Sequence, residues 1–86
     1  MQVIMYSKDN CVYCDKARNL LKVKAVESIE YKLGKDFERE TLLEEFPQAR
    51  SFPVITVDKK FIGGYNELKI VMDAVKMMKH MQGVNQ

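Results

Sequence analysis

Cys11 and Cys14, the only two cysteines in the chain, occupy positions i and i+3 of one short segment. They follow an apolar, strand-like run, Val3–Tyr6, and stand where a helical pattern begins. The first turn of a helix favours a thiolate over a thiol, because its free amides and dipole attract negative charge. Residues at i and i+3 of a helix also lie on the same side, so the two sulfurs are within reach of each other. The pair therefore indicates redox chemistry on sulfur.

Two other uses of a cysteine pair carry less weight. A disulfide that closes a loop of about four residues contributes only about 2 kcal/mol before strain, and small domains that depend on disulfides carry several. A zinc site needs three or four protein ligands. The other soft ligand is His80, which we expect to be a solvent-facing helix residue. We therefore expect no metal site.

Length and charge limit the remaining classes of function. Eighty-six residues predict a single domain over 1–86, with 82–86 as a frayed tail. A net charge of +2, from 14 basic and 12 acidic side chains, is too small to indicate nucleic-acid binding. No apolar stretch reaches the roughly 18 residues that span a bilayer. We expect a cytoplasmic monomer without a membrane segment or secretory signal.

The apolar pattern alternates between strand-like and helix-like segments. Strands are expected over Val3–Tyr6, Ser28–Leu33, Pro53–Val57 and Phe61–Ile62, and helices over Cys11–Lys24, Asp36–Phe46 and Tyr65–Met81. Asn10 is placed to cap the first helix. On the last helix the expected core face consists of Leu68, Val71, Met72, Val75 and Met78, widened by Ile70, Ala74, Met77 and Met81.

This order of elements predicts an α/β fold, βαβ-α-ββ-α. The first two strands should be parallel, with a right-handed crossover through the first helix. The hairpin should add an antiparallel pair, which gives a four-stranded mixed sheet flanked by three helices.

Three motifs, in order along the chain, resemble the glutaredoxin family of the thioredoxin-like fold, in its small dithiol form. The first is Tyr6-Ser7-Lys8 leading into Cys11-Val12-Tyr13-Cys14, and the second is Ser51-Phe52-Pro53. The third is Phe61-Ile62-Gly63-Gly64-Tyr65-Asn66-Glu67-Leu68. The absence of Trp and of a Gly-Pro between the cysteines distinguishes the chain from thioredoxin itself.

The resemblance implies a thiol–disulfide oxidoreductase that uses glutathione as reductant. Cys11 would be the nucleophile and Cys14 the resolving thiol, with positive charge supplied by Lys8 and Lys16. The bond between Phe52 and Pro53 would be cis, and the backbone of Phe52 would pair with glutathione. The remaining implied glutathione contacts are Lys8, Tyr13, Gly64, Tyr65 and Asn66, with Arg50 a weaker candidate for the same carboxylate as Lys8.

Two residues depart from the family pattern and keep alternatives open. Val12 stands where many glutaredoxins have proline, and Asn66 stands where Asp is common. Because Asn66 lacks the charge of Asp, an alternative function stays open. In this alternative the protein is a redoxin that a thioredoxin reductase reduces, with ribonucleotide reductase as a candidate substrate. A third interpretation is a carrier in which glutathione and Cys11 from two chains hold an iron–sulfur cluster, although Tyr13 crowds the space for it.

Overall fold

The computed structural model describes residues 1–84, and side chains as far as residue 74. Its strands are β1 (Val3–Ser7), β2 (Ser28–Lys32), β3 (Val54–Val57) and β4 (Lys60–Gly63), and its helices are α1 (Val12–Val23), α2 (Arg39–Glu45) and α3 (Tyr65–Val84). The described part of the chain thus has the expected three helices and four strands, in the expected order. The last helix was expected to end at Met81, but α3 continues to Val84, so residues 82–84 of the expected frayed tail are helical. Residues 85 and 86 lie outside the described part.

The strands form one mixed sheet in the order β2-β1-β3-β4. β1 runs parallel to β2, with Tyr6 beside Tyr31, and antiparallel to β3, with Tyr6 beside Val54. β3 and β4 form an antiparallel hairpin with an irregularity between Ile55 and Thr56. The predicted mixed sheet is confirmed, and it brings the carboxyl end of β1 beside the amino end of β3.

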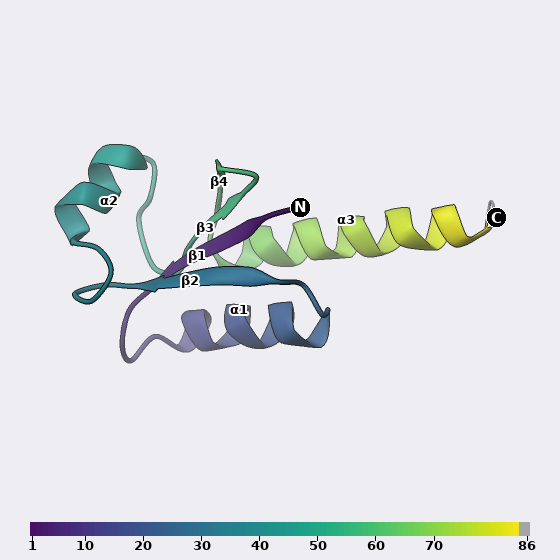
Figure 1. Ribbon diagram of the computed structural model, residues 1–86, viewed down its shortest axis with the longest axis horizontal. Helices are drawn as coiled ribbons and strands as arrows, with labels where there is room; N and C mark the ends of the chain where they lie inside the picture. The colour runs from purple at the N-terminus through teal and green to yellow at the C-terminus, as the bar shows by residue number, and fades with distance from the viewer. Residues whose placement is uncertain (85–86) are drawn as a thin grey trace.

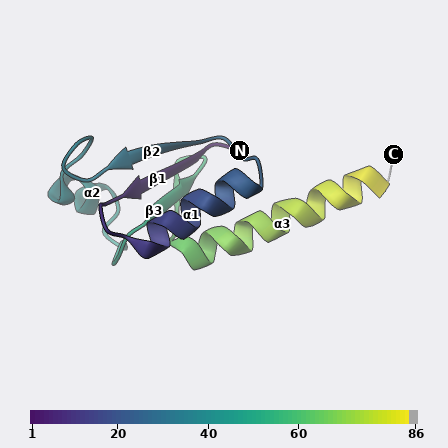
Figure 2. The same ribbon diagram turned by 90° about the horizontal axis from the view of Figure 1, so that it is seen from below.

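Side chains that alternate along β1 fill two cores on opposite faces of the sheet. Val3 and Met5 pack with residues of α1 and α3 in a core made of Val3, Met5, Ala17, Leu21, Ile55, Leu68 and Met72. Figure 2 shows α1 and α3 side by side on that face. On the other face Tyr6 contacts a smaller core of Leu42, Phe46 and Val54, which α2 covers. Figure 1 shows α2 at one end of the sheet and α3 running past the other.

The expected start of the second helix was wrong. The helix begins at Arg39, not at Asp36. The carboxylate of Asp36 instead accepts a hydrogen bond from the backbone N–H of Lys32 at 2.9 Å, and Leu33 forms a single bridge with Phe37. An acidic side chain that bonds a nearby backbone amide stabilises a turn in competition with a helix.

The widened apolar face expected on the last helix was also wrong where it can be checked. Leu68 and Met72 are buried, whereas Ile70 is 67% exposed and Ala74 is exposed. Only the face of α3 that carries Leu68 and Met72 packs against α1 and the sheet, so the second stripe is not covered. Val75, Met77, Met78, His80 and Met81 lie outside the residues whose side chains are described.

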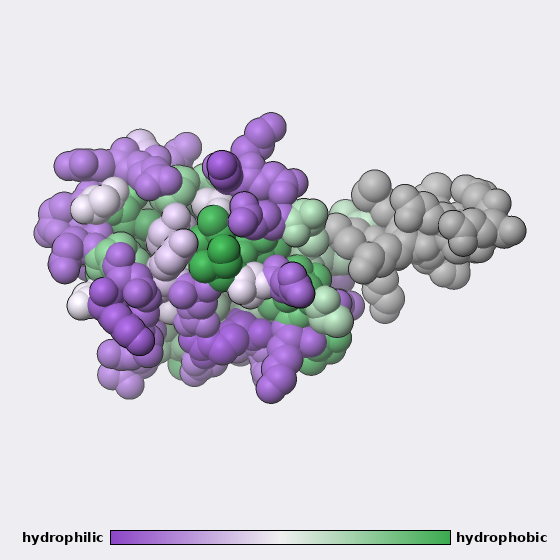
Figure 3. Space-filling model, viewed as in Figure 1, coloured by the Kyte–Doolittle hydropathy of each residue, from purple (hydrophilic) through white to green (hydrophobic). Residues whose placement is uncertain are grey.

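Strand β2 is an edge of the sheet, and its apolar side chains are only partly covered. Ile29 is 41% exposed and Tyr31 is 37% exposed. Figure 3 shows a small hydrophobic area over β1 and β2 in the middle of this face, bordered by hydrophilic side chains. None of the described helices is both long and apolar enough to cross a membrane.

Candidate active site

The two cysteines lie at the start of α1 and form a disulfide. Cys11, with an extended backbone, is itself the N-cap, so the expected cap at Asn10 was wrong. Its Sγ accepts a hydrogen bond from the backbone N–H of Cys14 at 3.1 Å. Asn10 has a φ of 54° and serves as the turn residue that leads into the cap. A sulfur therefore occupies the position at which a helix best stabilises negative charge.

The two sulfur-bearing residues differ in access. Cys11 is 8% exposed and lines a surface pocket, whereas Cys14 is fully buried and does not line that pocket. An external disulfide can therefore approach Cys11 alone.

The loop before Cys11 is held by charged side chains. Asp9 forms an ion pair with Lys32 at 2.9 Å, at the end of β2. This contact lowers the pKa of Asp9 and raises the pKa of Lys32. The neighbouring Lys8 turns the other way and places its Nζ 5.8 Å from the centre of the Phe52 ring. The loop thus presents a cation, rather than a carboxylate, to the pocket.

A second set of charges ties β1 to β2 and α1. Glu30 accepts hydrogen bonds from Arg18 at 2.8 and 2.6 Å and from the hydroxyl of Ser7 at 2.6 Å. Arg18 also pairs with Asp15 on α1. The hydrogen bond from Arg18 is the main cause of a lowered pKa of Glu30. Since Ser7 ends β1, this network fixes the strand from which the active-site loop departs.

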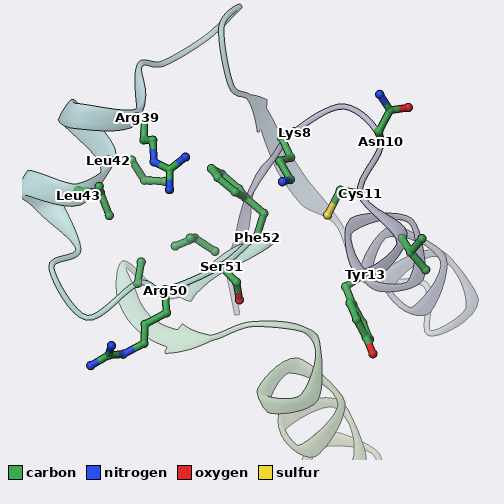
Figure 4. A pocket seen from close by; sticks show the side chains of 13 residues that line it. Lys8, Asn10, Cys11, Tyr13, Arg39, Leu42, Leu43, Arg50, Ser51 and Phe52 are labelled. Carbon is green, nitrogen blue, oxygen red and sulfur yellow. The ribbon is translucent and has the colours of Figure 1, made fainter.

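The pocket beside Cys11 has a volume of about 490 Å³ and lies between the active-site loop and α2. Three cationic side chains line the pocket: Lys8, Arg39 and Arg50. Among the residues that the structure describes, no carboxylate lines it. In Figure 4 Lys8 and Arg39 extend toward Phe52, whereas Arg50 points away from Cys11. The pocket is therefore suited to an anionic ligand.

Arg39 was missed by the sequence analysis. It opens α2, 28 positions after Cys11, and only the packing of Leu42 and Phe46 against the sheet brings it to the pocket. Its position at the first turn of an amphipathic helix was the available signal, but nothing local relates it to the cysteines.

A smaller pocket of about 280 Å³ adjoins the first and shares Tyr13, Ser51 and Phe52 with it. Its other lining residues are Pro53, Gly64, Tyr65, Asn66 and Glu67. The bond between Phe52 and Pro53 is cis, as expected. All seven expected glutathione contacts line one or both of these pockets. Lys16, by contrast, lies outside both pockets, with its Nζ 5.1 Å from the centre of the Tyr13 ring.

The start of α3 depends on two glycines and on Glu67, which the sequence analysis did not single out. The carboxylate of Glu67 accepts a hydrogen bond from the backbone N–H of Gly64 at 2.8 Å, the return half of a capping box. Gly63 has a φ of 128°, and a Cβ there would lie 2.5 Å from Oε1 of Glu67. A Cβ on Gly64 would lie 3.3 Å from the carbonyl oxygen of Pro53. Backbone thus approaches backbone closely at this wall of the pocket.

Comparison with known proteins agrees with this geometry. The family model for glutaredoxins matches residues 3–62. A probable glutaredoxin from Synechocystis sp. is 34% identical over 77 residues, which are 88% of each chain. The crystal structure of glutaredoxin 1 from Francisella tularensis superposes with a TM-score of 0.74 at 25% identity, over 86% of this chain and 94% of that one. A buckwheat glutaredoxin in complex with glutathione has a TM-score of 0.63 at 25% identity, over 94% of this chain and 69% of that one.

A four-stranded mixed sheet with three helices and a Cys-x-x-Cys pair at the first helix defines the thioredoxin-like thiol–disulfide oxidoreductases. Within that class, this chain belongs to the glutaredoxin family. Its active site contains the redox-active pair Cys11 and Cys14.

Proposed function

We propose that the protein is a glutathione-dependent oxidoreductase that reduces protein disulfides and glutathione mixed disulfides. The difference in access between the two cysteines carries this proposal, since Cys11 lines the pocket and Cys14 is fully buried. A single domain over 1–86 would act as a monomer in the reducing cytoplasm, where glutathione is available.

The catalytic cycle assigns one role to each cysteine. The Cys11 thiolate attacks a disulfide, forms a mixed disulfide and releases the first substrate thiolate. With a protein disulfide, the Cys14 thiolate then attacks Sγ of Cys11 and releases the second thiolate. Two electrons pass to the substrate, and the Cys11–Cys14 disulfide remains. Two glutathione molecules then restore the dithiol and leave as glutathione disulfide.

The two adjoining pockets suggest how glutathione binds. Tyr65 and Asn66 offer free amides at the start of α3, which suit the γ-glutamyl carboxylate. The backbone of Phe52 suits the cysteinyl unit, and Lys8 suits the glycyl carboxylate. Tyr13, whose ring centre is 6.0 Å from that of Tyr65, flanks the tripeptide.

One observation favours a second candidate function. Asn66 lines the pocket as an uncharged residue, so no carboxylate at that position meets the glutathione ammonium group. A charge-assisted hydrogen bond is stronger than a neutral one by about 1 kcal/mol, which corresponds to several-fold in affinity. A thioredoxin reductase would then recharge the protein, with ribonucleotide reductase as a candidate substrate in either case.

A comparison of reductants tests the proposal. Turnover of a disulfide substrate is measured with glutathione plus glutathione reductase, and separately with thioredoxin reductase, each with NADPH. We expect sustained turnover with glutathione. Turnover with thioredoxin reductase but not with glutathione would contradict the glutathione-dependent function and support the second candidate.

A further inference from the structure

Lys32, the last residue of β2, is held in place through its own backbone. Its N–H donates a hydrogen bond to the carboxylate of Asp36 at 2.9 Å, and its carbonyl oxygen accepts one from the backbone N–H of Asp36 at 2.8 Å. The next residue, Leu33, donates its N–H to the carbonyl oxygen of Ser7 at 2.9 Å. The backbone of Lys32 is therefore fixed beside the end of β1, from which the active-site loop departs.

The side chain of Lys32 reaches from this fixed backbone to the active-site loop. Its Nζ lies 2.9 Å from Oδ1 of Asp9, whose side chain is 77% exposed. Among the described residues, Asp9 forms an ion pair with Lys32 alone. Asp9 precedes Cys11 by two positions, so at most about 7 Å separates the Cα atoms of the two residues. The ion pair thus determines where a negative charge close to the reacting sulfur lies.

An unpaired carboxylate on Asp9 would oppose the ionisation of Cys11 in two ways. Its charge would repel a thiolate, which raises the pKa of a nearby thiol. It would also compete for the free amides at the start of α1, because aspartate is among the residues that best accept hydrogen bonds there. In the structure the sulfur of Cys11 holds that position and accepts the hydrogen bond from the N–H of Cys14. A carboxylate held elsewhere leaves these amides to the sulfur.

The second carboxylate close to Cys11 in the sequence is also paired with a cation. Asp15, on the first turn of α1, bonds Arg18 at 2.8 Å, and Arg18 bonds Glu30 of β2 as well. The cations that face Cys11 come from its own loop, from α1, from α2 and from the segment before β3, and they are Lys8, Lys16, Arg39 and Arg50. Replacement of Lys32 changes none of these groups, so it isolates the effect of Asp9.

We propose that Lys32 is a positioning residue for the thiol chemistry: it holds Asp9 at the end of β2, away from the start of α1, so that Cys11 ionises without a competing carboxylate. This inference rests on the proposed function, which takes Cys11 as the attacking residue. Lys32 lines none of the described pockets and acts through Asp9. The reaction steps are unchanged, and Lys32 alters the fraction of Cys11 that is a thiolate at neutral pH.

The test follows alkylation of Cys11 by iodoacetamide against pH in the fully reduced, full-length protein, with the modified residue identified by mass spectrometry. We expect Lys32→Gln to raise the pH of half-maximal alkylation by about 0.5, the scale of one charge about 7 Å away in largely aqueous surroundings. Lys32→Arg keeps the cation and should leave that pH unchanged. Circular dichroism checks that each variant is folded.

A double variant separates positioning from a direct effect of the lysine charge. Charges at fixed positions act additively, so a direct effect of Lys32 on the sulfur would be equal with and without Asp9. We expect instead that Lys32→Gln shifts the pH of half-maximal alkylation less than half as far in the Asp9→Asn background. Lys60→Gln is the matched control, because Lys60 is an exposed strand lysine without an ion pair to any described residue. It should shift nothing.

Salt provides an independent measurement. In about 1 M NaCl, where the Debye length is about 3 Å, the shift caused by Lys32→Gln should shrink because its cause is an exposed charge. A shift that persists undiminished in salt, equal shifts in the two backgrounds, or no shift at all would overturn the role of Lys32. Alkylation of Cys14 before Cys11 in the wild-type protein would instead contradict the assignment of Cys11 in the proposed function.

Discussion

The Sγ of Cys11 accepts a hydrogen bond from the backbone N–H of Cys14, so the two active-site residues are joined through the backbone as well as through sulfur. The donor belongs to the first turn of α1, and its geometry depends on the helix rather than on the disulfide. When the disulfide is reduced, the same amide is available to a Cys11 thiolate. The backbone N–H of Cys14 would therefore stabilise the attacking Cys11 thiolate.

The two cysteines should respond differently to substitution by serine. Cys11→Ser should reduce all activity to background, because among the described residues Cys11 alone brings a sulfur to the pocket. Cys14→Ser should retain reduction of glutathione mixed disulfides and lose reduction of protein disulfides, since only the latter requires a resolving thiol. Both activities are measured on each variant. Equal losses in the two variants would contradict the assigned roles.

Asn66→Asp should improve the use of glutathione. The substitution adds a carboxylate at the pocket wall, where it can pair with the ammonium group of the γ-glutamyl unit. A gain of about 1 kcal/mol would lower KM for a glutathione mixed disulfide several-fold. Asn19→Asp, on the exposed surface of α1, is the control for added charge. An unchanged KM in Asn66→Asp would exclude this position as the ammonium contact.

Gly63→Ala should destabilise the protein more than Gly34→Ala. Both glycines have a positive φ, 128° and 84°, so each alanine has an unfavourable backbone conformation worth about 1 kcal/mol or more. At Gly34 a Cβ would have nothing within 4 Å, whereas at Gly63 it would displace Glu67. The displaced carboxylate would lose its hydrogen bond to Gly64, at a further cost of about 1 kcal/mol.

Urea denaturation of the two alanine variants measures this difference directly. The Gly34 variant reports the backbone cost alone, and the excess in the Gly63 variant reports the loss at the start of α3. Equal free energies of unfolding would mean that Glu67 adjusts without losing its bond. Such a result would remove Glu67 as the residue that holds this pocket wall.

Glu30 should make stability depend on pH. Its pKa is lowered in the folded protein, chiefly by Arg18, from an ordinary value of 4.5. A lowered pKa stabilises the fold above the unfolded value, and this contribution is lost as the pH falls below about 4.5. Because the side chain of Arg18 is 46% exposed, we expect no more than about 1 kcal/mol near neutral pH.

The comparison of Glu30→Gln with wild type tests this dependence. Glutamine keeps an acceptor for the hydroxyl of Ser7 but removes the charge that Arg18 meets. The wild-type advantage in free energy of unfolding should therefore shrink as the pH falls from about 5 toward the lowered pKa of Glu30. Glu44→Gln serves as control, because Glu44 forms no ion pair with a described residue. A constant difference across this range would exclude the ion pair as its source.

The order of elements could be predicted from the sequence because each strand and helix carries its own apolar period. The parallel alignment of β1 with β2, in which Tyr6 lies beside Tyr31, follows from the predicted crossover through α1. The antiparallel pairing of β1 with β3, in which Tyr6 lies beside Val54, was not predicted. Competition between local hydrogen bonds limited how well the start of the second helix could be predicted. Asp36 could begin a helix or bond the amide of Lys32, and only the folded turn decides between them.

The candidate site was predicted as far as its residues lie in recognisable motifs. The expected contacts from Lys8 to Asn66 line the two adjoining pockets. Arg39 was missed because its place depends on how α2 packs on the sheet, which no local pattern records. The wrong cap at Asn10 has a similar origin, since a cysteine sulfur is an uncommon N-cap acceptor and was considered only for its redox chemistry.

Alkylation of the reduced protein by iodoacetamide, followed against pH with the modified site assigned by mass spectrometry, tests the central claim most directly. The claim is that one accessible sulfur, stabilised by the start of α1, performs the chemistry. We predict that Cys11 is modified first and that its rate is half-maximal well below about pH 8.5, the ordinary value for a cysteine thiol. Modification of Cys14 first, or a half-maximal rate at the ordinary value, would contradict the account.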